Sequence, residues 1–232
     1  CFDKKNFKSK KNKKKIYKYY KSDISNIKNL NLALKNCNLV FYKASTLGGP
    51  QSANIKYAQQ YIKNNVEKLK IFLNKLKNYK IKKIVYDSSF QIFGTKNNKN
   101  KEILPYNYYG LSKLAAEKIL ISWCKNNSVN LDILRYPRII DESNNSFISK
   151  MISDAYFKFK IIINDERKKF RIVHLKDVIK ANLLSYKKIN TGIRTLNISI
   201  KKEYNLLEIA KIIKSRLKSK IKIIVKKNIH KT

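Results

Sequence analysis

A tyrosine followed four residues later by a lysine can carry out proton chemistry, because positions i and i+4 lie on one face of a helix. The chain contains four such pairs, namely Tyr17/Lys21, Tyr79/Lys83, Tyr109/Lys113 and Tyr156/Lys160. With 15 tyrosines and 53 basic residues among 232 positions, composition alone explains about that many. The spacing therefore selects none of them, and the surrounding elements have to decide.

Three of the pairs lack a setting that would position them. Tyr17 lies in a basic run, residues 4–21, which reads as a loop, a helix surface or a tail. Tyr79 stands between the end of a helix and the start of a strand, so its pair spans a turn. Tyr156 comes late in a helix beside two phenylalanines, which is typical of a packing residue.

The setting of Tyr109 is different. It begins a helix expected over 107–127, and Ser89 ends a strand expected over 82–89. In a doubly wound parallel sheet, the carboxyl ends of strands and the starts of the following helices line the same crevice. We therefore predict that Ser89, Tyr109 and Lys113 converge there.

These three residue types suit a hydride-transfer enzyme. A phenol titrates near pKa ~10 and is a poor base at neutral pH. An adjacent ammonium and a helix N-terminus both favour the phenolate, and Lys113 and the helix start supply them. Tyr109 would then take or return a proton at a carbinol while hydride passes to or from a nicotinamide. The Ser89 hydroxyl would hold the substrate oxygen.

Strand and helix patterns alternate through the first part of the chain. Short apolar runs predict strands, and apolar residues three and four positions apart predict helices. We expect strands over 37–45, 82–89 and 129–137, and helices over 54–79 and 107–127. This alternation indicates an α/β fold with a Rossmann-like, doubly wound parallel sheet.

After Pro137, which stops the last of these strands, the rhythm changes. We place a boundary near residue 140. Residues 1–140 would form the NAD-binding domain, and 141–232 a mixed segment that completes the sheet and forms a small substrate domain. The later helices are expected at "SFISKMISDAYFK", "KDVIKANLLSYKK" and "NLLEIAKIIKSRLK", and the strands at "KIIIND", "FRIVHL", "RTLNISI" and "KIKIIVKK".

The net charge of +38 raises the question of a nucleic-acid partner. Only six of the 53 basic residues are arginine. The lysine excess comes with many Asn, Ile and Tyr residues, whose codons are rich in A and T, so we attribute the charge mainly to base composition. A lysine-rich nucleic-acid-binding module remains the less favoured alternative, and no specific nucleic acid is expected.

The cysteines and the apolar runs indicate the cellular compartment in which the protein is expected. Cys1, Cys37 and Cys124 are unclustered and lie at no metal-ligand spacing from a histidine, so neither disulfides nor a metal site are expected. No apolar run reaches the ~18–20 residues of a membrane span, and no signal peptide is recognisable. We therefore expect a cytoplasmic protein without a membrane partner.

The segments "VYDSSFQIFG" (85–94) and "YYGLSKLAAEK" (108–118) resemble the extended short-chain dehydrogenase/reductase family, the NAD-dependent epimerase/dehydratases of nucleotide sugars. The resemblance extends from about Cys1 to about Lys227. It implies catalytic roles for Ser89, Tyr109 and Lys113, NAD as cofactor and a nucleotide sugar as substrate, and it is compatible with a homodimer. The implied cofactor contacts are Asp3, Asp23, Ile24, Ala44, Ser45, Asn64, Tyr109, Lys113 and Pro137.

Some of these residues have a second interpretation. Asp23 could instead be the N-cap of the helix that follows it. Because Lys4 and Lys5 lie next to Asp3, NADP remains an alternative to NAD as the cofactor. Within "RIVHLKDV", His174 and Asp177 are expected to be structural.

The chain also departs from the family pattern. The Gly-x-x-Gly-x-x-Gly turn that cradles the cofactor pyrophosphate is missing from the sequence. We therefore expect the family's first strand, glycine turn and first helix, and its C-terminal end, to be lacking. Lys43 occupies an apolar position of the pattern. Phe170 stands where nucleotide-sugar enzymes carry an arginine, which leaves Arg171 and Arg138 as candidate substrate contacts.

The sequence thus predicts an epimerase, dehydratase or dehydrogenase of a nucleotide sugar. A catalytically inactive fragment of the same fold remains as the alternative.

Overall fold

The computed structural model describes residues 2–3, 18–94, 102–141, 147–163, 169–190, 192–217 and 220–226. Most of the basic run, residues 4–17, lies outside them. The chain forms two compact units. The first comprises Cys1–Arg135 and Asn182–Asn197, and the second Tyr136–Ala181 and Ile198–Thr232. The chain therefore leaves the first unit close to the expected boundary and returns to it for one short segment.

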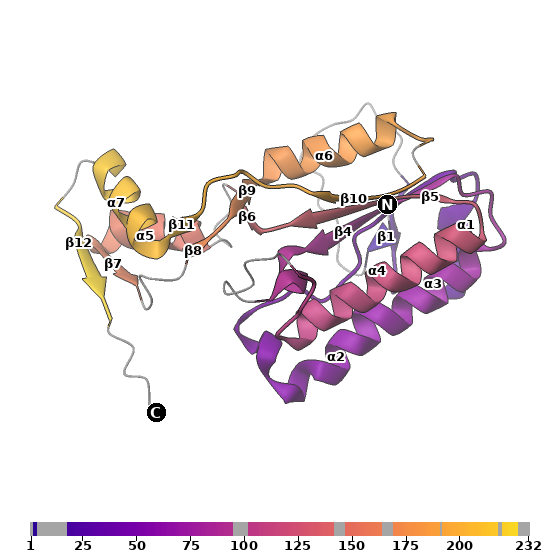
Figure 1. Cartoon of the computed structure of the whole chain (residues 1–232), viewed down its shortest axis with the longest axis horizontal. Coiled ribbons are helices and arrows are strands. Elements are labelled where there is room, and N and C mark those ends of the chain that lie inside the picture. The colour runs from indigo at the N-terminus through magenta and orange to yellow at the C-terminus, as the bar shows by residue number, and fades with distance from the viewer. Residues whose placement is uncertain are drawn as a thin grey trace. The chain divides into compact units, whose positions relative to one another are not determined.

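A four-stranded sheet is the centre of the first unit (Figure 1). β3 pairs in parallel with β4, and β10 in parallel with β5, which confirms the α/β fold with a parallel sheet. Most residues of β4 and β5 are buried, as expected for strands covered on both faces. The strand order is β10 (Ile193–Asn197), β5 (Asn130–Tyr136), β4 (Lys83–Ser89) and β3 (Leu39–Tyr42).

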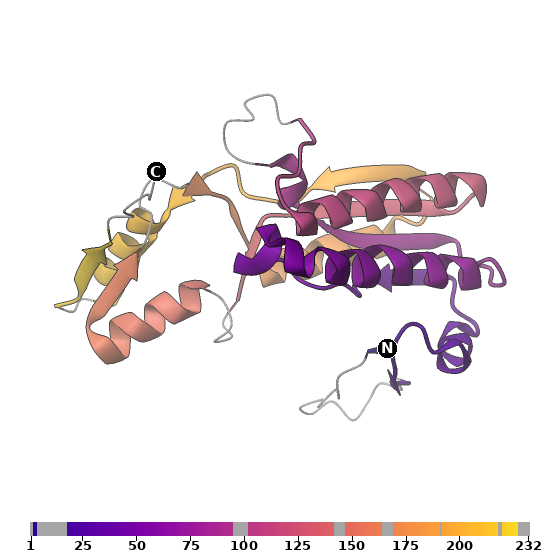
Figure 2. The same ribbon diagram turned by 90° about the horizontal axis from the view of Figure 1, so that it is seen from below.

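Helices α3 (Lys68–Leu76) and α4 (Tyr108–Asn126) lie side by side along the sheet (Figure 2). Their apolar stripes form one core with the strands and with α1 (Ile27–Leu34). The stripe expected in the earlier helix supplies Leu69, Leu73 and Leu76, all at most 2% exposed. The core also contains Ala116 and Leu120 of α4, Ile84 of β4, and Leu131 and Ile133 of β5.

The single helix expected over 54–79 is interrupted. A 3-10 turn, Ile55–Tyr57 (η2), leads into α2 (Ala58–Ile62), a π-helical turn, Lys63–Glu67 (η3), and then α3. A π turn inserts one extra residue and often marks a functional site. Here it contains Asn65, which is 2% exposed and bonded inside the protein.

A separate pair of strands lies near the N-terminus. β1 (Phe2–Asp3) pairs in parallel with β2 (Tyr20–Lys21). The common dinucleotide-binding sheet has the strand order 3-2-1-4-5-6. In that order β2 and β1 would be strands 3 and 2, β3, β4 and β5 would be strands 4, 5 and 6, and β10 is a further strand beside β5. No described strand occupies the position between β1 and β3.

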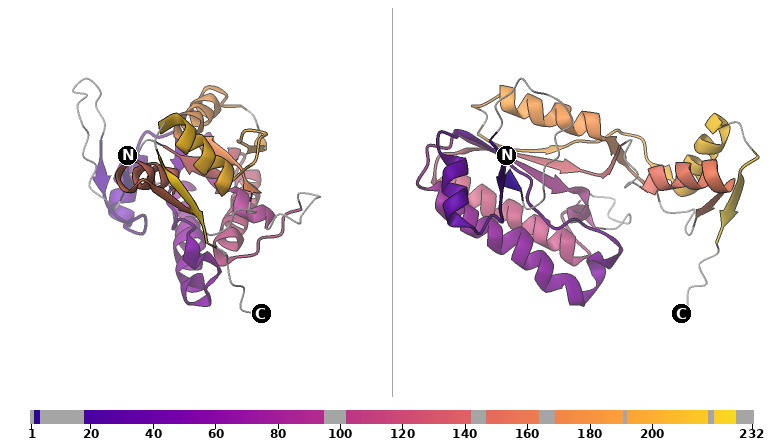
Figure 3. Two further views of the ribbon diagram at one scale, coloured as in Figure 1. Left: turned by 90° about the vertical axis from the view of Figure 1, so that its left-hand side faces the viewer. Right: turned by 180° about the vertical axis from the view of Figure 1, so that it is seen from behind.

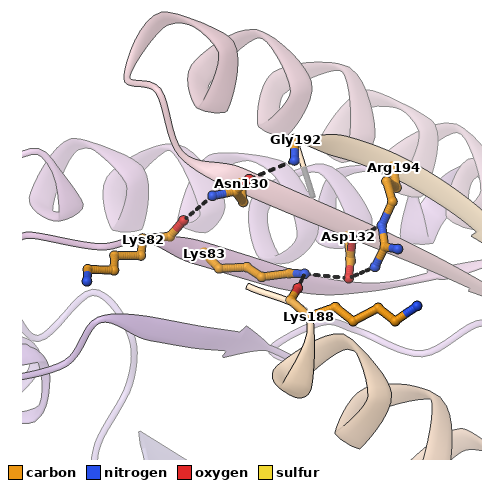
Figure 4. Close-up of polar contacts among 7 residues, drawn as sticks. All are labelled: Lys82, Lys83, Asn130, Asp132, Lys188, Gly192 and Arg194. Atoms are coloured by element: carbon orange, nitrogen blue, oxygen red, sulfur yellow. Dashed lines mark hydrogen bonds and ion pairs between the residues drawn. The ribbon is translucent and has the colours of Figure 1, made fainter. Parts of the chain in front are cut away.

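A buried charge cluster holds the returning segment, residues 182–197, to the sheet (Figure 4). Lys83 of β4 and Asp132 of β5 are both 0% exposed, and their charged atoms lie 2.7 Å apart. Arg194 of β10 donates two hydrogen bonds, of 2.8 and 2.7 Å, to the same carboxylate. The Lys83 ammonium also donates to the carbonyl of Lys188 at 2.5 Å. This cluster links β4, β5 and β10 with Lys188, the residue that follows α6 (Leu175–Lys187).

The second unit has a core of its own. β7 pairs in parallel with β12, and α5 and α7 pack on them (Figures 1 and 3). Met151, Ala155, Ile161 and Ile213 are among its buried residues. β8 pairs with β11 and β6 with β9. The elements are β6 (Arg138–Ile140), α5 (Phe147–Lys158), β7 (Lys160–Ile163), β8 (Lys169–Phe170), β9 (Ile172–His174), α6 (Leu175–Lys187), β11 (Tyr204–Asn205), α7 (Leu206–Leu217) and β12 (Lys222–Val225).

None of the helices in the described part of the chain combines the length and the hydrophobicity that a membrane span requires.

Candidate active site

Ser89, Tyr109 and Lys113 lie together where β4 ends and α4 begins. Ser89 is the last residue of β4, Tyr109 is the second residue of α4, and Lys113 follows one turn later. The Ser89 side chain is near enough to the Tyr109 hydroxyl to favour its ionised form. The Lys113 ammonium donates to the backbone carbonyl of Asp87 at 2.5 Å, which directs it to the end of the same strand.

Local capping fixes the two segments that carry these residues. Asn107 is the N-cap of α4, and its side chain accepts from the Gly110 amide at 2.7 Å and donates to Gln91 at 2.8 Å. Ser89 caps the 3-10 turn Phe90–Phe93 (η4) by accepting from the Gln91 amide. Gln91 therefore ties the end of the strand to the start of the helix.

Gly110 allows this close approach. A Cβ atom at Gly110 would lie 2.5 Å from the carbonyl oxygen of Gln91, closer than real Cβ contacts. Any side chain there would push the start of α4 away from Ser89.

The Tyr109 ring is buried, with 8% of the residue exposed. It packs edge-on against Tyr61 with 5.8 Å between ring centres. Burial raises the pKa of Tyr109 to about 12, although the Ser89 side chain acts to lower it. The sequence-based expectation of a favoured phenolate is therefore not met in this structure, because the effect of burial is larger. The Lys113 ammonium is directed to the Asp87 carbonyl and lies 4.2 Å from the centre of the Tyr86 ring.

Lys113 is the most strongly perturbed cation of the site. It is 2% exposed, and burial lowers its pKa to about 7, although Asp87 and Glu117 act to raise it. Glu117, one turn further along α4, is itself held by Arg135 through bonds of 3.0 and 2.6 Å. It also accepts from the Ser88 hydroxyl at 2.5 Å. Lys113 is thus a buried amine whose charge depends on its neighbours.

A polar network that the sequence did not reveal supports the site. The Asn65 side chain donates to the Ser112 hydroxyl at 2.9 Å and accepts from the Thr46 amide at 2.6 Å. The predicted residue, Asn64, reaches only the Thr46 hydroxyl, at 2.9 Å. The π turn gives the two asparagines these different directions. One feature of the sequence could have identified Asn65. It lies three residues after Ile62, on the face of the expected helix that carries the apolar residues.

Asp23 and Ile24 follow β2. The Asp23 carboxylate accepts from the amide and hydroxyl of Ser25 at 2.9 and 2.7 Å and pairs with Lys68 at 2.8 Å. The alternative that Asp23 caps the following helix is wrong, because the N-cap of α1 is Asn26. Ile24 is 9% exposed and belongs to the core.

The remaining cofactor candidates lie at strand ends. Ala44 is exposed and Ser45 is half-buried, and they follow β3 after Lys43. Pro137 follows β5. Asp3 pairs with Lys21 through the backbone of β1 and β2, and its side chain lies outside the described residues.

The two candidate substrate arginines belong to the second unit and differ in their partners. Arg171 pairs with Glu203 at 3.4 Å. The guanidinium of Arg138 lies over two aromatic rings, 5.0 Å from the centre of Phe170 and 5.3 Å from that of Phe147. The His174 ring accepts from the Lys176 amide at 3.1 Å, at the start of α6.

A parallel sheet with a serine, a tyrosine and a lysine converging at a strand end and a helix start defines the short-chain dehydrogenase/reductase class. Within that class the chain belongs to the NAD dependent epimerase/dehydratase family, whose model matches residues 1–200.

Two curated relatives support this assignment. The chain is 26% identical over 233 residues to a dTDP-D-glucose 4,6-dehydratase of Dictyostelium discoideum, covering 80% of this chain and 52% of the relative. It is 30% identical over 159 residues to a putative UDP-glucose 4-epimerase of Methanocaldococcus jannaschii, covering 62% and 50%. The chain thus spans about half the length of the curated relatives it matches.

Solved structures share the fold at low sequence identity. MoeE5 in complex with UDP-glucose and NAD superposes with a TM-score of 0.80 at 20% identity, covering 90% of this chain and 72% of that one. A UDP-glucuronic acid 4-epimerase from Bacillus cereus gives 0.78 at 21% identity, with coverage of 90% and 68%. A UDP-N-acetylglucosamine 4-epimerase from Methanobrevibacter ruminantium M1 gives 0.79 at 24%, with coverage of 90% and 69%.

Proposed function

We propose that this protein is an NAD-dependent enzyme that acts on a nucleotide sugar as an epimerase, dehydratase or dehydrogenase. The observation that carries the proposal is the convergence of Ser89 at the end of β4 with Tyr109 at the start of α4, with Lys113 buried one turn further along the helix and bonded to the Asp87 carbonyl of β4. The family membership and the nucleotide-sugar names of the relatives support it.

The candidate residues would bind the two ends of NAD. Pro137 and the Tyr109–Lys113 turn would face the nicotinamide and residues 23–24 the adenine, while residues 44–45 would also contact the cofactor. The pyrophosphate is a poorer fit, because the five glycines of the chain form no glycine-rich turn. When bound, the nicotinamide would accept and return a hydride.

The proposed role of Tyr109 is to move the proton. At neutral pH its phenol is protonated, since burial raises its pKa to about 12. The Tyr109 hydroxyl can therefore donate to a sugar oxygen, and the nearby Ser89 side chain offsets part of the cost of removing the proton from Tyr109. Ser89 would hold the same oxygen in place.

For the substrate phosphates we propose Arg138. It has no acidic partner among its described contacts, and the Phe147 and Phe170 rings hold its guanidinium. Arg171 is a weaker candidate because Glu203 neutralises it. The ring of Phe170, at the position where an arginine was expected, thus holds an arginine from another strand.

The test is the conversion of a panel of UDP- and dTDP-sugars by the protein and its Tyr109→Phe variant at an NAD concentration high enough to saturate a weak site. We expect Tyr109→Phe to abolish turnover while NAD binding persists, since the hydroxyl carries the proton but little of the cofactor affinity. The matched control is Tyr156→Phe, which has the same tyrosine–lysine spacing but an exposed ring, 64% accessible. Turnover by Tyr109→Phe close to that of the control would refute the assignment.

A further inference from the structure

Lys43 and Asp87 form an ion pair at the carboxyl ends of two neighbouring strands. Tyr42 and Tyr86 are the last paired residues of β3 and β4, so Lys43 and Asp87 are the next two across the sheet. The Lys43 ammonium lies 2.6 Å from the Asp87 carboxylate, with the side chains 40% and 27% exposed. Lys43 also donates to the Asn182 side chain.

Asp87 contacts a second lysine through its backbone. Its carboxylate pairs with Lys43, and its carbonyl accepts from the ammonium of Lys113. One residue therefore connects an exposed cation with the buried cation beside Tyr109.

The charges that face Lys113 come from four places in the first unit. β4 supplies Asp87 and the Tyr86 ring, and the residue after β3 is Lys43. Its own helix supplies Glu117, which is paired with Arg135 of β5. Arg135 already grips Glu117 with both ends of its guanidinium. Of the two carboxylates, Asp87 is therefore the one whose charge Lys43 can balance directly.

We propose that Asp87 is a positioning residue for Lys113, holding its ammonium in place and charged, and that Lys43 limits this effect by neutralising the Asp87 carboxylate. The inference rests on the proposed roles of Tyr109 and Lys113. The pair would set the fraction of molecules in which Lys113 carries its proton at neutral pH.

The two partners must then act on Lys113 in opposite directions. Burial lowers the pKa of Lys113 to about 7, Asp87 acts to raise it, and Lys43 acts to lower it. Removing the Lys43 charge should raise the Lys113 pKa, and removing the Asp87 charge should lower it. If Lys43 and Asp87 served only to stabilise the fold, removing their charges would not shift the Lys113 pKa in opposite directions.

The experiment is an NMR pH titration of the Lys113 side chain, observed at its Cε and Hε nuclei. The Tyr86 ring, 4.2 Å from the ammonium, should shift these signals away from those of the exposed lysines, and their loss in Lys113→Arg assigns them. We expect the Lys113 pKa to rise by about 1 unit in Lys43→Met and to fall by about 1 unit in Asp87→Asn. The control is Lys82→Met, which removes an exposed charge next to the opposite end of β4.

Shifts of the same sign in the two variants, or a shift in Lys43→Met no larger than in Lys82→Met, would overturn the proposal. If Asp87→Asn does not fold, Lys43→Met and Lys43→Gln carry the test, because Lys43 is partly exposed. The titration needs neither cofactor nor turnover. An inactive protein with the opposed shifts would refute the proposed function alone, and an active protein without them would refute this inference alone.

Discussion

Gly48 lies directly against the ring of Tyr109. A Cβ atom at position 48 would come within 2.7 Å of Cδ1 and 2.9 Å of Cε1 of that ring. The absence of a side chain at Gly48 thus lets the buried tyrosine lie between the loop after β3 and Tyr61.

We predict that Gly48→Ala lowers turnover by about 10²-fold with little loss of stability, because the added methyl displaces the Tyr109 hydroxyl from its position. The measurement is kcat alongside a thermal melt. Gly49→Ala is the control, since its Cβ would meet only the flexible end of Gln51. Equal activity of the two variants would contradict the prediction.

Asp132 gives a prediction about stability. Asp132→Asn would leave the fully buried ammonium of Lys83 without its carboxylate and weaken the grip of Arg194 on the sheet. Breaking a buried ion pair in this way costs roughly 3–5 kcal/mol. We expect a marked drop in the urea midpoint. Asp154→Asn, which breaks the exposed pair with Lys158, should barely change it.

The same carboxylate gives a pH dependence. Burial raises the pKa of Asp132, but hydrogen bonds from Arg194, Lys83 and Ser185 outweigh that effect and hold the pKa below its usual value. A depressed carboxyl pKa stabilises the fold above the unfolded-state pKa of ~3.9, and that stability is lost as the pH falls through the native value. We expect urea unfolding curves at falling pH to show a stability loss below about pH 4 that is smaller in Asp132→Asn. An equal loss in both proteins would contradict this.

Arg138 is expected to control substrate affinity. Arg138→Ala should raise the KM for the nucleotide sugar at least about tenfold, because a charged hydrogen bond to phosphate contributes roughly 1.5–3 kcal/mol. Arg171→Ala should change it little, since that guanidinium is paired with Glu203. Steady-state kinetics of both variants tests this, and a larger effect at Arg171 would reverse the two assignments.

The chain is predicted to bind NAD weakly. Its sequence contains no Gly-x-x-Gly-x-x-Gly motif to cradle a pyrophosphate, and the charge of +38 destabilises the compact state by self-repulsion at low salt. Calorimetric titration with NAD should show no micromolar binding, and thermal melts should move upward as salt is added. Tight binding with a salt-independent melt would mean that other residues replace the turn.

The sequence by itself determined the elements and the choice of Tyr109. Strand and helix periodicities are local properties of the chain, so β4, α4 and β5 were predicted to within a few residues. The order of strand, helix and strand then required Ser89 and Tyr109 to meet at one edge of a parallel sheet. That requirement follows from connectivity and needs no coordinates.

Only the tertiary structure decided how the side chains pair and how strongly burial acts on them. The side chain of Asn65 bonds to Ser112, and the Asp23 carboxylate pairs with Lys68 while Asn26 caps α1. The contacts of Asn65 and Asp23 join segments far apart in sequence, so sequence patterns did not predict them. The pairing of Lys43 with Asp87 comes from the register of β3 against β4, which spacing along the chain does not specify. The raised pKa of Tyr109 has the same origin, since desolvation depends on every neighbour that excludes water from the ring.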